Sequence, residues 1–182
     1  MKKLLIVVDM QNDFVDGALG TSEAQAIVPN VVNKIKNWDG DIICTRDTHS
    51  ENYLSTREGR NLPVNHCIAG TDGHKINSDV MKALEDKNAD KYPEAKDRIL
   101  NKYTFGSTVL PETIRPFGYN YIELIGLCTD ICVVSNAMIL KAHFPETDIA
   151  VDASCCAGVT PESHNAALTT MRMCQINILG EE

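Results

Sequence analysis

The sequence predicts a three-layer α/β/α fold, in which a doubly wound parallel sheet of about six strands lies between two layers of helices. Two observations predict it. Short apolar runs with the length of buried strands recur along the whole chain, and segments with apolar residues at helical spacing separate them. Strands that alternate with helices in this way pair in parallel, because a right-handed crossover lays each helix back across the sheet.

Each expected strand is rich in β-branched residues and has a length suited to burial on both faces. In chain order these runs are 4–9 (LLIVVD), 41–47 (DIICTRD), 98–102 (RILNK), 121–127 (YIELIGL), 148–153 (DIAVDA) and 176–180 (INILG). Several of the expected helices begin with Asp, Ser or Pro, which favour helix starts. The expected helices are 23–38, 76–87, 109–118, 130–144 and 161–174.

The composition favours one domain, residues 1–182, that acts on a small soluble partner. The apolar fraction of 43% is near the globular average, and no Gly/Ser-rich or Pro-rich linker is apparent. A net charge of −8 without clusters of Lys or Arg argues against a nucleic-acid or anionic-membrane surface. No apolar run approaches the ~20 residues of a membrane span, and the N-terminus turns acidic and polar too early for a signal peptide. We therefore expect a cytoplasmic protein, in which most of the seven cysteines are buried free thiols.

Candidate functional residues follow the first four expected strands. Asp9 follows the first strand, Asp47 and His49 follow the second, Lys102 follows the third, and the segment 128–132 follows the fourth. The ligand crevice of a doubly wound sheet lies beyond the carboxyl ends of its strands, so these side chains are expected to face one crevice. The stretch that follows residue 47, up to residue 75, lacks the periodicity of a regular element, and loops of that length are often functional.

Cys132 is the candidate nucleophile. Thr129 or Asp130 would cap a helix that places Cys132 in its first turn, where free N–H groups and the helix dipole favour a thiolate. A thiol also needs a base to take its proton and a cation to hold the thiolate, and Asp9 and Lys102 supply both. The alternatives are structural: Cys132 as a small buried residue, Asp9 as a cap for the turn in QNDF, and Lys102 as a side chain that points to solvent.

A metal site is the second candidate, in the long segment after the second strand. Its expected ligands are Asp47, His49, Glu58 and His66. Mixed carboxylate and imidazole ligands suit Zn²⁺, Mn²⁺ or Fe²⁺, and two ligands with one residue between them can reach the same ion from an extended chain. Acidic residues and histidines are also common in solvated loops, so spacing alone leaves that alternative open. His74, in a turn-rich stretch, is interpreted as a solvent-facing residue.

Four motifs in register over nearly the whole chain resemble those of the isochorismatase-like cysteine hydrolases, and among them the nicotinamidases. LLIVVDMQNDF resembles the opening strand of that family with its catalytic Asp, and TRDTH resembles the nicotinamidase metal motif. NKYTFGS resembles the catalytic Lys segment, and GLCTDICV resembles the nucleophile segment. DASCCAGVTPESHNAAL resembles the strand-to-helix passage that comes next.

The resemblance implies a role for each residue near the nucleophile. It makes Cys132 the nucleophile, Asp9 the general base and acid, and Lys102 the cation that orients and polarises both. It also implies a cis peptide bond between Leu127 and Cys128, which turns the backbone N–H groups of Cys128 and Cys132 toward the substrate as an oxyanion hole. The implied reaction is hydrolysis of a small amide such as nicotinamide to the acid and ammonia, through a thioester on Cys132.

The resemblance further implies one divalent metal ion beside this triad. Zinc is the expected ion, with manganese and iron as alternatives, and its implied ligands are Asp47, His49 and His66, with Glu58 as a fourth. A homo-oligomer, either a dimer or a tetramer, and a place in NAD salvage are implied as well.

The substrate contacts depart from the nicotinamidase pattern. Nicotinamidases often carry an aromatic residue shortly before the second metal histidine, whereas this chain has Leu62 and Val64 there. Stacking on a substrate ring would therefore fall to Phe14 and Phe105. Trp38, the only tryptophan, is interpreted as structural packing.

Three alternative functions stay open at this level. A metal-free isochorismatase or a ureido- or carbamoyl-amide hydrolase would keep the triad without the ion, and it would have no use for Asp47, His49 and His66. A non-enzymatic sensor or scaffold would have no physical reason to keep an acid, a cation and a thiol together. A zinc or redox protein built on cysteines is disfavoured, because the sequence has no CxxC pair.

Overall fold

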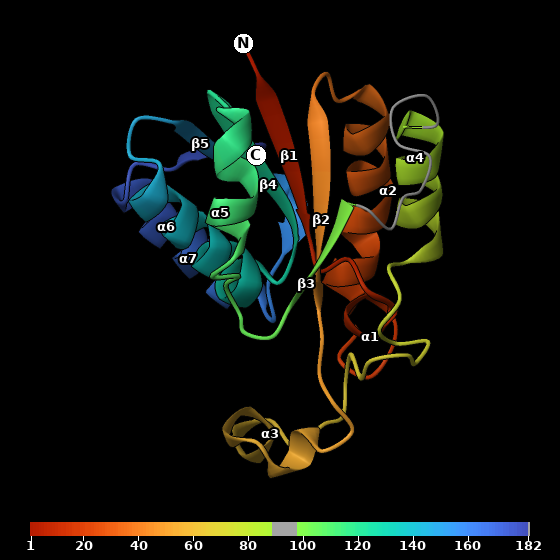
Figure 1. Cartoon of the computed structure of the whole chain (residues 1–182). Coiled ribbons are helices and arrows are strands. Elements are labelled where there is room, and N and C mark those ends of the chain that lie inside the picture. The colour runs from red at the N-terminus through yellow and green to blue at the C-terminus, as the bar shows by residue number, and fades with distance from the viewer. Residues whose placement is uncertain (89–97, 182) are drawn as a thin grey trace.

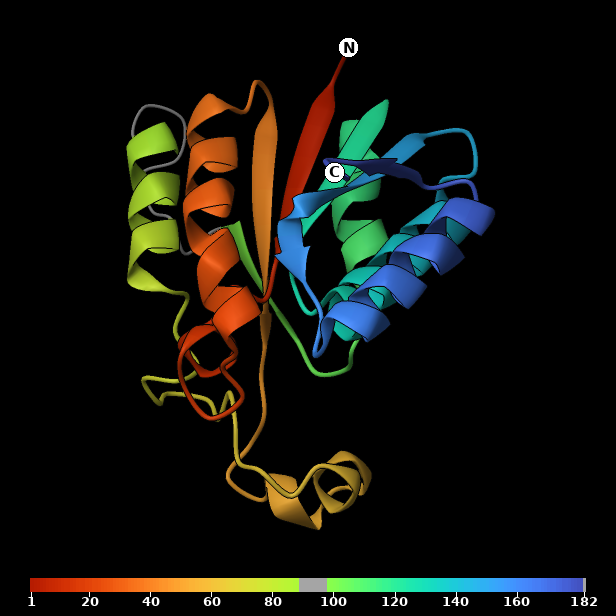
Figure 2. The ribbon, with the colours of Figure 1, turned by 180° about the vertical axis from the view of Figure 1, so that it is seen from behind.

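The computed structural model describes residues 1–88 and 98–181, and its strands form one sheet between two layers of helices (Figures 1 and 2). Neighbouring strands all pair in parallel, in the order β3-β2-β1-β4-β5-β6. The three-layer fold with a doubly wound parallel sheet of about six strands is therefore confirmed. The strands are β1 (Lys3–Val8), β2 (Asp41–Asp47), β3 (Ile99–Lys102), β4 (Tyr121–Leu127), β5 (Asp148–Ala157) and β6 (Asn177–Leu179).

Helices cover both faces of the sheet (Figures 1 and 2). One face carries α2 (Ser22–Asn37) and α4 (Ser78–Asn88), and the other carries α5 (Leu110–Ile114), α6 (Val134–His143) and α7 (Pro161–Met173). The expected helix over 109–118 is α5 followed by a 3₁₀ turn, Arg115–Phe117. Within the described part of the chain, no helix combines the length and the apolar composition that a membrane crossing requires.

Burial on both faces explains why the central strands read as continuous apolar runs. The side chains of β1 alternate between two cores: Leu5 and Val7 pack toward α2 and α4, whereas Leu4, Ile6 and Val8 pack on the opposite side with residues of α6 and α7. All five of these side chains are fully buried. Trp38 is also buried and stacks on Tyr121, which agrees with a packing role.

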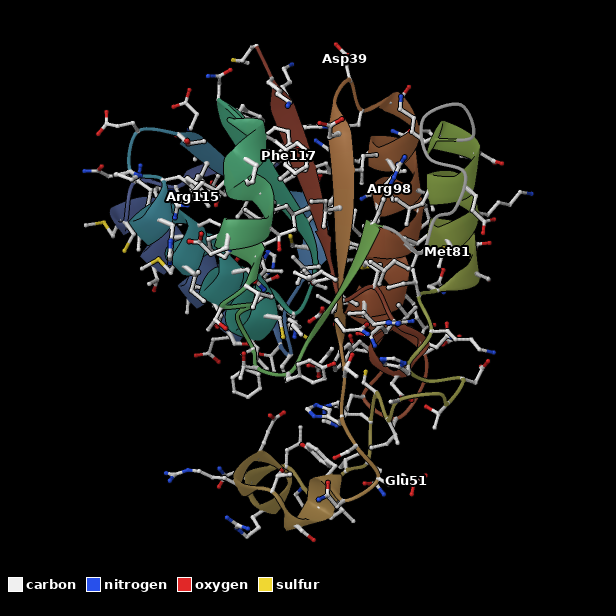
Figure 3. The ribbon with its side chains drawn as sticks, viewed as in Figure 1. Asp39, Glu51, Met81, Arg98, Arg115 and Phe117 are labelled. Carbon is white, nitrogen blue, oxygen red and sulfur yellow. The ribbon has the colours of Figure 1, made fainter. Side chains whose placement is uncertain are left out.

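The chain between β2 and α4 extends beyond the carboxyl ends of the strands (Figure 1). Asp39, before β2, and Glu51, after it, lie at opposite ends of the molecule (Figure 3). This excursion holds a 3₁₀ turn, Tyr53–Ser55, and the short helix α3 (Arg57–Asn61). The expectation that it lacks regular elements is wrong at these points. The Thr56 side chain caps α3 by accepting from the Gly59 N–H, and a local bond of this kind leaves no hydrophobic periodicity in the sequence.

Candidate active site

The strand order reverses between β1 and β4, and the chain that leaves these two strands carries Asp9 and Cys132. Such a reversal opens a crevice at the carboxyl ends of the strands. Asp47 and Lys102 are the last residues of β2 and β3, the next two strands along the same edge. The expectation that these side chains meet is confirmed by the contacts between them.

Lys102 lies at the centre of a buried charged cluster. Its Nζ is 2.7 Å from Oδ2 of Asp9 and 3.1 Å from Oδ1 of Asp47. It also donates a hydrogen bond to Sγ of Cys132 at 3.4 Å. The side chains of Lys102 and Asp9 have no exposed surface, so the alternative in which Lys102 points to solvent is wrong.

Asp9 directly follows β1 with a positive φ of 46°, a conformation that residues other than glycine rarely adopt. Its backbone N–H donates to the Thr45 carbonyl at 3.2 Å, and its Oδ1 accepts from the Thr45 hydroxyl at 2.7 Å. Backbone strain of this kind is concentrated at functional sites. The carboxylate thus turns toward Lys102 and Thr45, and the alternative in which it caps the turn of QNDF is wrong.

The segment after β4 forms a π-helical turn, Thr129–Val133, that leads into α6. The peptide bond between Leu127 and Cys128 is cis, as the resemblance implies. The expected caps are wrong. Cys128 holds the N-cap position without a side-chain bond, while Asp130 accepts from the Val159 N–H on the neighbouring loop.

The surroundings of Cys132 disfavour the charged form of its sulfur. Burial raises the pKa of Cys132 well above its ordinary value, and the Asp9 carboxylate raises it further, against the opposing charge of Lys102. Burial therefore works against the thiolate that the helix start is expected to favour. Burial likewise raises the pKa of Asp9. Burial opposes the charge of Lys102, but Asp9, Cys132 and Asp47 outweigh it and raise the pKa of Lys102.

Asp47, His49 and His66 each bring one ligand atom to within 4.8 Å of the others, and all three are buried. Oδ2 of Asp47 is 2.9 Å from Nε2 of His49 and 3.8 Å from Nε2 of His66. Nδ1 of His66 lies 2.8 Å from the Val64 carbonyl. Because a carbonyl only accepts, Nδ1 is the donor in this bond, and Nε2 is the ring nitrogen that faces Asp47.

These three residues fit a divalent metal ion. His49 Nε2 is buried and has no hydrogen-bond partner among the described residues, although it lies beside the Asp47 carboxylate. A buried ring nitrogen without a hydrogen-bond partner is available to bind a metal ion. One carboxylate and two imidazoles form a donor set that suits Zn²⁺ and related first-row ions.

Glu58, the expected fourth ligand, is farther out. Its Oε1 is 3.6 Å from Nε2 of His49, and its side chain is 26% exposed. It lies on α3 and stands outside the group of three converging atoms.

An apolar cavity of about 220 Å³ opens beside Cys132 and the candidate metal ligands. Phe14 and Phe105, the two residues expected to contact a substrate, both line it. Phe14 is buried, with its ring centroid 5.6 Å from that of His66, whereas Phe105 is 48% exposed. The rest of the wall is mainly aliphatic: Leu19, Leu62, Ile131 and Val159.

Polar side chains that sequence reasoning missed surround this site. His74 is buried, and its Nε2 lies 2.9 Å from the Thr48 hydroxyl, so its interpretation as a solvent-facing residue is wrong. Gln11 is also buried and bonds to the backbone of Asp47. The one signal for Gln11 is its place two residues after Asp9, just beyond a buried strand.

The chain belongs to the isochorismatase family, since the model of the isochorismatase domain matches residues 3–182. Within that family it is similar to a nicotinamidase from Schizosaccharomyces pombe, with 27% identity over 98% of this chain and 93% of the relative. It is 30% identical to an uncharacterised isochorismatase family protein, PncA, from Bacillus subtilis, over 93% of each chain. A pyrazinamidase of Pyrococcus horikoshii, solved in complex with zinc, superposes with a TM-score of 0.77 and 27% identity over the full length of both chains.

Proposed function

We propose that this protein is a metal-assisted cysteine amidohydrolase of nicotinamidase type, which hydrolyses a small amide such as nicotinamide to the acid and ammonia. The observation that carries the proposal is the contact of one buried ammonium, Lys102, with Asp9, Asp47 and Cys132. These contacts join the thiol and its acid to the candidate metal ligands, and Cys132, Asp47 and His66 all line one apolar cavity. The nicotinamidase and pyrazinamidase names of its relatives support the same reaction class.

The first half of the reaction begins with the buried thiol. Burial raises the pKa of Cys132, so its proton leaves as the sulfur attacks, and Asp9, which shares the contact with Lys102, takes that proton. The new C–S bond places negative charge on the former carbonyl oxygen, which the backbone N–H groups of Cys128 and Cys132 stabilise. Collapse breaks the C–N bond, Asp9 returns the proton to the departing nitrogen, and ammonia leaves a thioester on Cys132.

The second half reverses these roles. Asp9, again ionised, removes a proton from a water molecule that attacks the thioester carbonyl. The C–S bond then breaks, Asp9 gives the proton to the sulfur, and the acid is released with the thiol restored. Lys102 stabilises Asp9 as a carboxylate and holds it beside the sulfur, because its ammonium contacts both groups.

A divalent ion would be held by Asp47, His49 and His66, with Glu58 as an outer ligand. When bound, it supplies a Lewis acid that can bind a ring nitrogen of the substrate and water molecules. We propose zinc, in line with the zinc-bound pyrazinamidase relative, with manganese or iron as alternatives.

The cavity sets limits on the acyl group. Its wall favours a small apolar ring, with Phe14 on the side of the metal ligands and Phe105 at the more exposed side. Leu62 stands where nicotinamidases often have an aromatic residue, so one face of a bound ring would meet an aliphatic side chain.

A metal-free amide or isochorismate hydrolase on the same triad is the alternative. It is less well supported, because it gives no account of the three converging ligand atoms or of the orphaned His49 Nε2.

We further propose that residues 1–182 act as one domain, which a single sheet shared by both halves of the chain supports. We also propose that the protein is a homo-oligomer, either a dimer or a tetramer, and that it is cytoplasmic. Sedimentation analysis of the purified protein would test the oligomeric state.

The test is ammonia release from nicotinamide by the purified protein, with Cys132→Ala and a chelated sample in parallel. Cys156→Ala is the matched control, since it removes another buried thiol, on β5. The proposal expects release by the parent and by Cys156→Ala only. Turnover of other amides, ureido compounds or isochorismate through Cys132, with nicotinamide inert, would keep the triad and contradict the substrate.

A further inference from the structure

Gln11 uses its whole side chain to hold the backbone of Asp47. Its Oε1 accepts from the Asp47 N–H at 2.7 Å, and its Nε2 donates to the Asp47 carbonyl at 2.9 Å. The same Nε2 donates to the His74 carbonyl at 3.0 Å. β1 ends at Val8, so it no longer offers backbone partners to the last residue of β2, and the Gln11 amide takes their place.

Asp13 holds the backbone beside a second candidate ligand. Its Oδ2 accepts from the Cys67 N–H at 2.7 Å, and Cys67 directly follows His66. Cys67 has a positive φ of 47°, so the chain turns there through a conformation that needs outside support. The second oxygen of Asp13 accepts from the Ala18 N–H at 3.3 Å, which fixes the carboxylate itself.

Both residues belong to the short segment that follows Asp9. Asp13 lies on α1 (Asn12–Val15), and Gln11 immediately precedes that helix. Figure 1 shows α1 at the carboxyl end of the sheet, beside the chain that returns from α3 toward α4. One segment therefore contacts both the end of β2, with Asp47, and the part of the chain that returns from α3, with His66.

We propose that Gln11 and Asp13 are positioning residues of the metal site, which set the distance between Asp47 and His66 through the backbone of Asp47 and of Cys67, the residue after His66. The inference rests on the proposed function, because it takes these residues as metal ligands. Outer contacts of this kind change metal affinity by about ten- to a hundredfold when they are removed. Neither side chain needs to touch the ion for this effect.

The first test is Gln11→Glu, which keeps the shape of the side chain but replaces the Nε2 donor with an oxygen that faces two carbonyls. The matched control is Gln25→Glu, the same change at an exposed position on α2. Zinc affinity is measured by competition with a chromogenic chelator. We expect an affinity about ten- to a hundredfold below that of the parent for Gln11→Glu, and the parent value for Gln25→Glu.

The second test compares Asp13→Ala with Asp13→Asn. The Asn side chain keeps an oxygen that can accept from Cys67, whereas Ala keeps none. We expect weaker zinc binding and an altered absorption spectrum of the cobalt-substituted protein for Asp13→Ala, with recovery toward the parent for Asp13→Asn. Circular dichroism of the chelated proteins checks their folding, and the Asp13 pair decides the matter where Gln11→Glu does not fold.

Two outcomes overturn the inference. Zinc affinities within twofold of the parent for both Gln11→Glu and Asp13→Ala would leave the metal site standing and remove the positioning role. A parent protein that binds no zinc would remove both, while ammonia release that depends on Cys132 would show that the cysteine chemistry survives without the ion.

Discussion

Replacement of Lys102 by Met tests the charged cluster most severely. The substitution keeps the length of the side chain and removes the ammonium that contacts Asp9, Asp47 and Cys132. Two carboxylates would then lie in a buried site without their shared cation, since the side chains of Asp9 and Asp47 are 0% and 4% exposed.

The expected loss of stability follows from that burial. Removal of one partner from a buried ion pair typically costs about 3–5 kcal/mol, and because Lys102 serves two carboxylates we expect about 4–5 kcal/mol. Lys34→Met is the matched control. Lys34 also joins two carboxylates, Glu123 at 2.7 Å and Asp152 at 2.5 Å, but its side chain is 26% exposed and it lies outside the candidate site. We expect a loss of about 1.5–3 kcal/mol there.

Stability is measured by urea unfolding in the presence of a chelator, with circular dichroism as the readout. Activity is measured separately, as ammonia release without the chelator. We expect Lys102→Met to lose about 10²–10³-fold in turnover, because a preorganised charge beside the reacting groups is gone. Lys34→Met should keep turnover near that of the parent. A Lys102→Met protein as stable as the parent would contradict the role of the buried ammonium, and so would an equal loss of turnover in Lys34→Met.

Three further predictions concern local packing. Gly126→Ala should lower the free energy of unfolding by more than about 2 kcal/mol in the same urea assay, because a Cβ there would lie 2.1 Å from the Val8 carbonyl oxygen and φ is 114°; an unchanged midpoint would contradict this. Thr160→Ala should cost about 1 kcal/mol, since the Thr160 side chain caps α7 in a capping box with Ser163, and thermal unfolding would show the loss. Leu62→Ala should raise KM about three- to tenfold with stability within about 0.5 kcal/mol of the parent, because it removes part of the cavity wall from an exposed position. Leu54 is 47% exposed, against 39% for Leu62, and lies outside that wall, so Leu54→Ala should change neither quantity; an equal rise in KM for both variants would contradict the role of Leu62.

The part of the site that depends on the topology of the sheet could be predicted from the sequence. Asp9, Asp47, Lys102 and Cys132 each follow or end an apolar run, and the carboxyl ends of parallel strands must share one edge. The position of these residues along the chain was therefore enough to predict that they meet. The cis peptide bond between Leu127 and Cys128 was predicted only from the resemblance, because no local pattern in GLCTD indicates it.

The errors arose where burial or a distant partner decides. Burial raises the pKa of Cys132, and the depth of that burial cannot be read from the sequence. Asp130 would cap its own helix if it were alone, but the Val159 N–H of a neighbouring loop competes for its carboxylate. His74 looked exposed because its surroundings are turn-rich, yet the fold brings the Thr48 hydroxyl to its ring. Gln11 was overlooked for the same reason, since its partners lie 36 and 63 positions away.

The central claim is that Cys132 carries the acyl group between the two halves of the reaction. The most direct measurement is intact-mass spectrometry of the protein, quenched in acid during turnover of nicotinamide. We expect a fraction of the parent protein to carry one nicotinoyl group, located on the peptide with Cys132, and no such adduct on Cys132→Ala. An adduct on another residue, or ammonia release by Cys132→Ala at the parent rate, would contradict it.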